Sequence, residues 1–253
     1  MVHFVGAGPG AADLITLRGA ALLEQADQVI YAGSLVNPAL LLRCKEDCRI
    51  LNSAEMTLEQ VLEAIQSAEA EGKTTVRLHT GDPSLYGAIR EQMERLEALS
   101  IPCDVTPGVS SFSAAAAALQ AEYTLPGVSQ TLILTRLPGR TPVPEAEKME
   151  ELSRHGASMA IFLSAGFLDR LQRALLQGAY TENTPAAIVY KASWPEEKLL
   201  RCPLGKLAET AKEAGISKTA LVLVGDFLAG DFARSRLYDP AFTTEFRKGT
   251  ETP

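Results

Sequence analysis

Two glycine-rich turns carry the strongest chemical signal in the sequence. The first is VGAGPG at residues 5–10, and the second is HTGDP at residues 79–83. Glycine has no Cβ and so lets a ligand approach the backbone closely, and proline stiffens a turn by fixing φ. Each turn follows an apolar segment that we predict to be a strand. We therefore expect both at the carboxyl edge of one sheet, where open α/β sheets bind ligands.

The first turn, taken alone, also fits a dinucleotide fingerprint. Gly6, Gly8 and Ala11 match G-x-G-x-x-[GA], and Asp27 follows at the distance of a ribose-binding acid. This pattern suggests a nicotinamide-dependent oxidoreductase. Against that reading, Pro9 has no backbone N–H to offer a pyrophosphate.

Two further segments support either a structural or a ligand-binding interpretation. Asp82 is suited to cap the helix that follows it, or to accept hydrogen bonds from a ligand. In TPGVSS at residues 106–111, Ser110 and Ser111 are ordinary N-caps, or they bind a polar ligand at the positive end of a helix. Together with the two glycine turns, these segments favour the ligand-binding interpretation.

Cations and metal-binding residue types give weaker signals. The three histidines are scattered, and Cys44 and Cys48 are not followed by a second cysteine pair, so we expect reduced thiols and no metal site. Four cations are candidates for binding an anionic ligand, although most surface charges are simply solvated: Arg136, Arg140, Arg154 and Lys191.

Composition narrows the class of protein. The chain has 253 residues, 46% of them hydrophobic, which suffices for one large or two small domains. Its net charge of −7 argues against nucleic-acid and membrane partners. We find neither a signal-peptide pattern nor an apolar run of about 20 residues, so we expect a cytoplasmic protein.

Hydrophobic periodicity places these segments on alternating strands and helices. Thr57 and Gln60 form a predicted capping box, and Gly72 is placed to end the same helix. The predicted strands are Val2–Val5, Gln28–Tyr31, Thr74–His79, Cys103–Val105, Thr131–Thr135, Met159–Leu163, Ala186–Tyr190, Lys198–Cys202 and Ala220–Val224. The predicted helices are Thr16–Leu23, Thr57–Glu71, Tyr86–Leu99, Ala114–Ala118, Glu145–His155, Phe167–Leu176 and Leu204–Ala214.

The pattern breaks once, near residues 121–129, where proline and glycine interrupt it. We therefore predict two α/β domains: residues 1–122, which carry the glycine-rich loops, and residues 123–253. Closely spaced strands at 186–202 indicate a hairpin and a mixed sheet in the second domain. Residues 231–253 are polar, and we expect them to be extended.

The three loops, in this order and spacing, resemble the tetrapyrrole methyltransferase family. The segments that carry the resemblance are GAGPG at 6–10, GDPSLYG at 81–87 and PGVSS at 107–111. Ala11 stands where many relatives have an aspartate. Three other segments, GAADLIT at 10–16, YAGSLV at 31–36 and YKASWP at 190–195, are similar to the branch that methylates C11 of precorrin-4 or cobalt-precorrin-4.

The resemblance implies the fold, the cofactor and the assembly. It implies two α/β domains of the tetrapyrrole-methylase type, not the Rossmann type, with S-adenosyl-L-methionine in the inter-domain cleft and a homodimer as the usual assembly. The product would be S-adenosyl-L-homocysteine. By motif matching, the implied cofactor contacts are Pro9, Thr80, Gly81, Asp82, Leu85, Ser110, Ser111, Leu163, Tyr190, Ala192 and, more weakly, Ala220.

The implied reaction is displacement at a sulfonium methyl by a macrocycle carbon. The donor is already activated, so the main task is to align the reacting atoms, and no nucleophile triad is evident in the sequence. Arginines such as Arg136 or Arg140 would orient the substrate's carboxylates. Alternatives are another precorrin or uroporphyrinogen position, a diphthamide-type protein substrate, the oxidoreductase above, or a metabolite-binding protein without catalysis.

Overall fold

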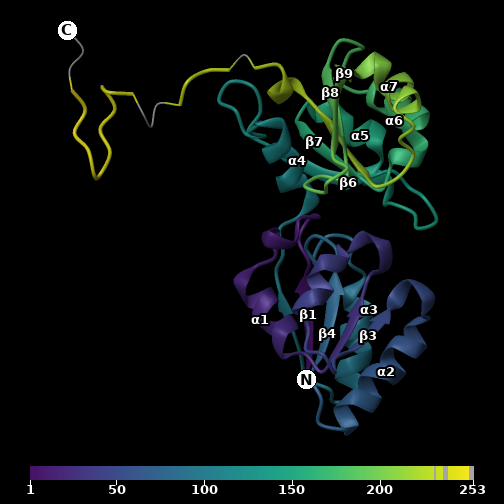
Figure 1. Ribbon diagram of the computed structural model, residues 1–253. Helices are drawn as coiled ribbons and strands as arrows, with labels where there is room; N and C mark the ends of the chain where they lie inside the picture. The colour runs from purple at the N-terminus through teal and green to yellow at the C-terminus, as the bar shows by residue number, and fades with distance from the viewer. Residues whose placement is uncertain (231, 236–238, 251–253) are drawn as a thin grey trace. The chain divides into compact units, whose positions relative to one another are not determined.

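The computed structural model describes residues 1–230, 232–235 and 239–250. The chain divides into two compact units (Figure 1). The N-terminal unit contains residues 1–118 together with 190–198, and the C-terminal unit contains residues 119–189 and 199–253. The sequence places the boundary between residues 122 and 123 but does not foresee that residues 190–198 return to the first unit.

The N-terminal unit is built on a five-stranded sheet in the order β3-β2-β4-β1-β5, and every strand pairing is parallel. Because β1 lies between β4 and β5, the loops that follow these three strands leave the same edge. The strands are β1 (Val2–Gly6), β2 (Gln28–Tyr31), β3 (Arg49–Asn52), β4 (Thr75–His79) and β5 (Cys103–Thr106). The helices are α1 (Leu17–Gln25), α2 (Leu58–Ala70), α3 (Ile89–Ala98) and α4 (Ser111–Leu119), the last of which ends at the unit boundary.

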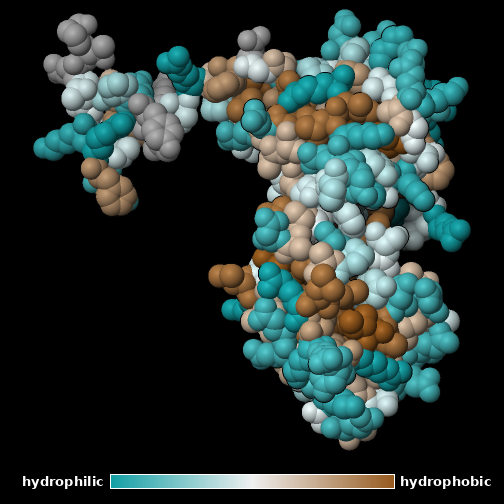
Figure 2. Space-filling view, viewed as in Figure 1, coloured by the Kyte–Doolittle hydropathy of each residue, from teal (hydrophilic) through white to brown (hydrophobic). Residues whose placement is uncertain are grey.

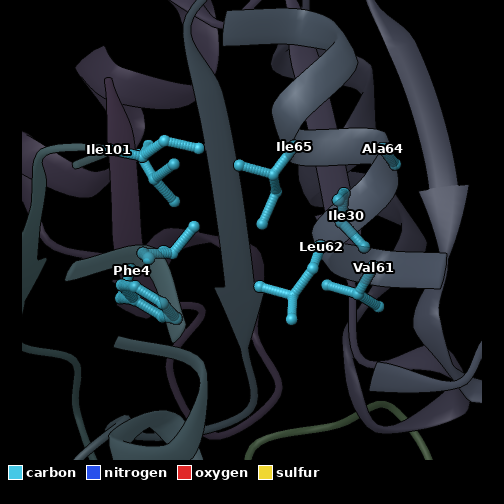
Figure 3. Close-up of a cluster of buried hydrophobic side chains, with 9 residues drawn as sticks. Phe4, Ile30, Val61, Leu62, Ala64, Ile65 and Ile101 are labelled. Atoms are coloured by element: carbon cyan, nitrogen blue, oxygen red, sulfur yellow. The ribbon is translucent and has the colours of Figure 1, made fainter. Parts of the chain in front are cut away.

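Both faces of this sheet are buried, which explains why its strands are nearly continuous apolar runs. On one face, Phe4 and Ile30 pack against Leu62 and Ile65 of α2 and Leu96 of α3 (Figure 3). The other face packs against α1 and the 3-10 turn 38–43. The two cores therefore cover both faces of the sheet that carries the glycine loops.

Local signals set the boundaries of several helices. The capping box predicted at α2 is present, because the Thr57 hydroxyl accepts from the Gln60 N–H and the Gln60 side chain accepts from the Thr57 N–H. Thr16 likewise caps α1. The prediction that a helix begins at Tyr86 is wrong, since Tyr86 and Ala88 have φ of +57° and +49°, and α3 starts only at Ile89.

The C-terminal unit has a second five-stranded sheet, in the order β6-β7-β10-β8-β9. It is mixed, because β6 pairs with β7 in parallel and β10 pairs with β7 antiparallel. Its strands are β6 (Leu132–Arg136), β7 (Ser158–Phe162), β8 (Pro185–Tyr190), β9 (Lys198–Pro203) and β10 (Ala220–Val224). Its helices are α5 (Met149–Leu152), α6 (Leu168–Leu175) and α7 (Leu207–Glu213).

Three sequence-based predictions need correction or completion. The helix predicted over 145–155 is split into a 3-10 turn, the short α5 and a second 3-10 turn, and Lys148, with ψ of 145°, separates the first turn from α5. The edge strand β3 was not predicted, since it has four residues and begins and ends with polar side chains. The extended tail predicted at 231–253 lies partly outside the described residues, and its described part contains no helix or strand.

The surface in view is mainly hydrophilic and is interrupted by apolar patches on each unit (Figure 2). This agrees with the chain's charge of −7 and its 22% charged residues. No helix of the described residues is long and apolar enough to cross a membrane.

Candidate functional site

The three loops predicted from the sequence meet at the carboxyl edge of the N-terminal sheet. The Gly81 N–H donates to the Gly8 carbonyl over 2.8 Å, and the Gly8 N–H donates to the Gly81 carbonyl over 3.2 Å. A Cβ added at Gly6 would lie 2.5 Å from the Gly108 Cα, and one added at Gly108 would lie 2.1 Å from the Gly81 oxygen. Since real Cβ atoms do not approach so closely, glycine is required where the loops cross.

Asp82 links the second loop to the third. Its Oδ2 accepts from the Gly108 N–H over 2.8 Å, and its Oδ1 accepts from the N–H and the hydroxyl of Ser84. Desolvation raises the pKa of this half-buried carboxyl, but the hydrogen bonds from Ser84 and Gly108 outweigh it, so the pKa lies below its ordinary value. Asp82 does not cap α3, which starts at Ile89, and its ionised carboxylate instead fixes two loops.

Residues 190–198 contact the first glycine turn. The Trp194 Nε1–H donates to the Pro9 carbonyl over 3.1 Å, and the Ser193 hydroxyl accepts from the Ala11 N–H over 3.0 Å. A Cβ added at Gly10 would lie 2.1 Å from the Trp194 ring. In the sequence, the segment 190–195 is marked by the resemblance and by Lys191 as a candidate cation. No periodicity indicates the contact, because it joins residues more than 180 positions apart.

Most of the predicted site residues of the N-terminal unit lie together. A Cβ at Gly81 would lie 3.7 Å from the Ser110 Cα and 3.8 Å from the Ser111 nitrogen, and one at Gly10 would lie 2.9 Å from the Ala192 oxygen. Within this loop cluster, Pro9 and Ser110 are buried, Leu85 and Tyr190 are half-buried, and Thr80 is exposed. The cluster therefore presents mainly backbone and one exposed hydroxyl.

Leu163 and Ala220 belong to the C-terminal unit and share one edge of its sheet. Leu163 directly follows β7, has φ of +51° and is 67% exposed. Continuing the β7–β10 register, in which Val222 is opposite Ile161, places Ala220 opposite Leu163. A left-handed, exposed leucine is a strained arrangement of the kind that concentrates at ligand sites.

The four cations proposed as an anion-binding rim differ in how far they are engaged. The Arg136 guanidinium donates to the carbonyls of Leu137, Thr141 and Pro142, so it holds the loop after β6. The other three are described together: Arg154 pairs with Glu151 over 2.8 Å, Lys191 pairs with Glu196 over 3.4 Å, and Arg140 is exposed.

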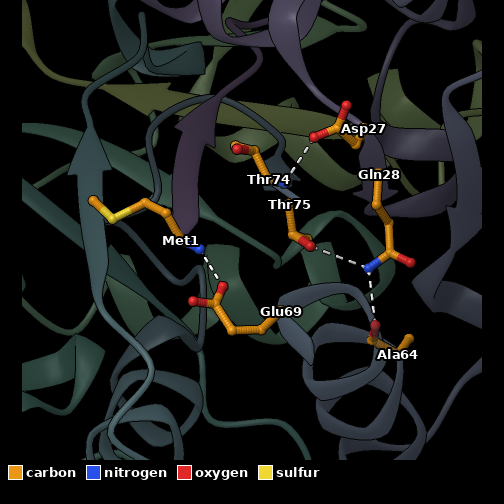
Figure 4. Close-up of polar contacts among 7 residues, drawn as sticks. All are labelled: Met1, Asp27, Gln28, Ala64, Glu69, Thr74 and Thr75. Atoms are coloured by element: carbon orange, nitrogen blue, oxygen red, sulfur yellow. Dashed lines mark hydrogen bonds and ion pairs between the residues drawn. The ribbon is translucent and has the colours of Figure 1, made fainter. Parts of the chain in front are cut away.

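Asp27 lies at the wrong end of the sheet for the dinucleotide interpretation. It precedes β2, whereas the glycine turns follow strands, so it sits at the amino edge. There its carboxylate accepts from the Thr74 N–H over 2.9 Å (Figure 4) and pairs with Lys45 over 2.8 Å. The hydrogen bond from Lys45, followed by that from Thr74, lowers the pKa of this carboxyl. Asp27 is therefore a structural anchor, and the ribose-binding role is wrong.

His79 is a feature that sequence reasoning missed. It ends β4, is 5% exposed, and its Nε2 has no hydrogen-bond partner among the described residues. Desolvation, and then the charge of Arg77, lower its pKa to about 3, so the imidazole is neutral at pH 7. In the sequence it is simply a histidine before a turn, because burial depends on the covering elements.

Among the described residues, no group of three or more histidine, cysteine, aspartate or glutamate side chains could hold a metal ion. What the structure offers instead is a glycine-lined edge built from backbone groups, a hydroxyl and one half-buried carboxylate. Such an edge suits an organic ligand held largely by main-chain hydrogen bonds.

These features define the class: an α/β protein with two five-stranded sheets, in which glycine loops after β1, β4 and β5 meet at one edge of the parallel sheet. A family model described as Tetrapyrrole (Corrin/Porphyrin) Methylases matches residues 1–208. The chain belongs to this family.

Curated relatives match along nearly the whole chain. The cobalt-precorrin-4 C(11)-methyltransferase of Methanocaldococcus jannaschii is 50% identical, over 98% of this chain and 96% of the relative. The precorrin-4 C(11)-methyltransferase of a Sinorhizobium species is 46% identical, over 97% and 98%.

Solved structures agree with the fold. The X-ray structure of a cobalamin biosynthetic enzyme, cobalt precorrin-4 methyltransferase, is 44% identical and superposes with a TM-score of 0.88 over 90% of this chain and 95% of that one. The uroporphyrin-III C-methyl transferase of Thermus thermophilus, complexed with S-adenyl homocysteine, is 24% identical with a TM-score of 0.75, over 93% and 96%. At that identity the second structure shows the fold alone.

Proposed function

We propose that this protein is an S-adenosylmethionine-dependent C-methyltransferase that methylates C11 of precorrin-4 or cobalt-precorrin-4 in cobalamin biosynthesis. The observation that carries the proposal is the 50% identity, across 98% of the chain, to a cobalt-precorrin-4 C(11)-methyltransferase. The glycine-lined edge supports it, because three loops of the family's pattern meet there.

The residues at this edge fit S-adenosylmethionine. The ligand has an adenine, ribose hydroxyls and an amino-acid group, all of which can bond to backbone N–H and C=O groups. The exposed Thr80 hydroxyl and the backbone of the crossing loops supply such partners. We assign the cofactor contacts to Pro9, Thr80, Gly81, Asp82, Leu85, Ser110, Ser111, Tyr190 and Ala192, with Leu163 and Ala220 from the second unit.

When bound, S-adenosylmethionine would supply an activated methyl group that a macrocycle carbon could take up with release of S-adenosylhomocysteine. The protein's part is to hold carbon, methyl and sulfur in line, which contributes to rate by orientation rather than by a covalent intermediate. Rigid loops suit this task, and here Asp82 and the Gly8–Gly81 bridge hold them.

The proposal extends to assembly and location. We propose a homodimer, supported by the resemblance of the three loops to a family that usually forms one. We propose a cytoplasmic location, supported by four cysteines that are all free thiols.

Calorimetric titration of the purified protein with S-adenosylhomocysteine, with NAD as the paired control, tests the cofactor. We expect micromolar binding of the former and none of NAD. Binding of NAD alone would contradict the proposal. Incubation with precorrin-4 and cobalt-precorrin-4 and methyl-labelled cofactor then tests the substrate, and label at a position other than C11 would overturn the assigned ring position.

A further inference from the structure

The first glycine turn is held by contacts from distant parts of the chain. Gly8 has φ of +80°, Pro9 lacks an N–H, and the carbonyls of Pro9 and Gly10 receive their hydrogen bonds from distant side chains. Asn37 Nδ2 donates to the Gly10 carbonyl over 2.8 Å. Residues 190–198 supply the contact to the Pro9 carbonyl, through Trp194, and a third contact, in which the Ser193 hydroxyl accepts from the Ala11 N–H.

The segment that makes these contacts is itself ordered by internal bonds. The Trp194 N–H donates to the Lys191 carbonyl over 3.0 Å, and the Glu197 N–H donates to the Trp194 carbonyl over 3.0 Å. The Ser193 N–H donates to the Glu197 carboxylate over 2.6 Å. Lys191 and Ser193 both have positive φ, +48° and +66°, so the segment keeps a strained shape that aims the side chains at the turn.

Lys191 orients the indole further. Its Nζ lies 5.2 Å from the centre of the Trp194 ring, within the range of a cation–π contact, and 3.4 Å from Glu196. The indole therefore has its face covered by an ammonium group and its N–H used by Pro9, while Gly10 leaves the space that the ring occupies. With the ammonium group on its face and its N–H bonded to Pro9, the indole is fixed in position against the turn.

We propose that Trp194 and Ser193 are positioning residues for the cofactor, acting through the Pro9–Ala11 turn, which they hold in its cofactor-binding conformation. This inference rests on the proposed function and deepens it. Neither side chain has to touch the cofactor. Releasing the turn should weaken cofactor binding, because part of the binding free energy would then be needed to order the turn.

The test compares Trp194→Phe, which keeps an aromatic ring but loses the N–H, and Ser193→Ala with the wild type. Ser217→Ala is the matched control, because Ser217 is exposed and lies in the other unit. Calorimetry gives the Kd for S-adenosylhomocysteine, and steady-state kinetics separates KM from kcat. Thermal unfolding monitors whether each variant is folded.

We expect each variant to raise the Kd and the KM for the cofactor by about 3- to 10-fold, the effect of one neutral hydrogen bond, with kcat within about twofold and the control unchanged. Kd values within twofold of the wild type would overturn this inference alone, even if the unfolding midpoint fell. Failure of the wild type to bind S-adenosylhomocysteine would overturn the proposed function and this inference with it.

The chain provides an independent readout, because Trp194 is its single tryptophan. In Gly10→Ala the added methyl would collide with the indole ring, so we expect a shifted emission maximum and a cofactor affinity lowered at least as much as in Ser193→Ala. Gly139→Ala is the control, since a Cβ there meets nothing within 4 Å. Displaced emission with wild-type affinity would also overturn the inference.

Discussion

Close backbone contacts between the loops determine which individual residues the candidate site requires. Gly6 and Gly108 are required because the loops cross at distances that no Cβ allows, and Gly81 is favoured because its φ is +60°. Asp82 is the one carboxylate that joins two of these loops, and its three hydrogen bonds keep it ionised. Asp82 therefore acts directly on the geometry of the loops, and through that geometry it would affect cofactor binding.

We expect Asp82→Ala to leave the protein folded but to lower its unfolding free energy by about 2 kcal/mol, because hydrogen bonds to a charged acceptor are lost. Binding of S-adenosylhomocysteine should weaken at least about tenfold. Denaturant unfolding and calorimetry measure the two effects. Asp169→Ala, at an exposed position of α6, is the control. An unchanged Kd would refute the assignment of Asp82 to the cofactor site.

Among the secondary-structure elements, β4 leads into the second glycine turn and also carries a buried titratable group, His79. His79 ends this strand with its ring 5.8 Å from the ring of Phe4. Arg77, on the same strand, donates to Gln92 of α3 and to the Ile30 carbonyl. Desolvation lowers the pKa of Arg77 to about 10, still above neutral pH, so the neighbouring charge persists. Protonation of His79 would therefore place a second buried cation near Arg77.

This arrangement predicts acid sensitivity with a definite sign. The folded-state pKa of His79, about 3, lies below the value of 6.5 for a free histidine, so the unfolded chain binds the extra proton. Stability should consequently fall as pH decreases below about 6.5, by about 1.4 kcal/mol per pH unit from this group, until about pH 3.

His79→Leu should remove that component, because it keeps a similar volume and cannot be protonated. Urea unfolding of both proteins between pH 7 and pH 4 measures the difference, which should reach about 3 kcal/mol at pH 4. The comparison cancels the carboxylates that titrate in the same range. If the unfolding free energies of the two proteins changed in parallel with pH, the lowered pKa of His79 would be contradicted.

At the scale of the whole molecule, the chain does not divide at a single point. Residues 190–198 connect β8 to β9 yet belong to the N-terminal unit, where they contact the first glycine turn. A fragment ending near residue 122 would lack them. The functional edge of the first sheet therefore depends on a segment encoded more than 60 residues after the boundary between the units.

The proposed homodimer is a property at this scale. Sedimentation velocity of the purified protein should return twice the chain mass of 27.1 kDa at micromolar concentration. The value should not depend on salt between about 0.1 and 0.5 M if the interface is mainly apolar, because screening weakens only charge pairs. A single species at the mass of one chain would contradict the proposal.

The alternation of strands and helices in the first unit, the capping box of α2 and the three glycine loops could be predicted from the sequence, because these depend on local periodicity and on residue types with special φ. The sequence did not reveal the break at Lys148 or the edge strand β3, where short elements take their shape from neighbours.

Tertiary structure alone showed that Asp27 accepts a hydrogen bond from Thr74, that Asp82 joins two loops, that His79 is buried with no partner for Nε2 among the described residues, and that Trp194 contacts Pro9. Each of these features depends on contacts between residues far apart in the chain, and a local sequence pattern does not indicate such contacts.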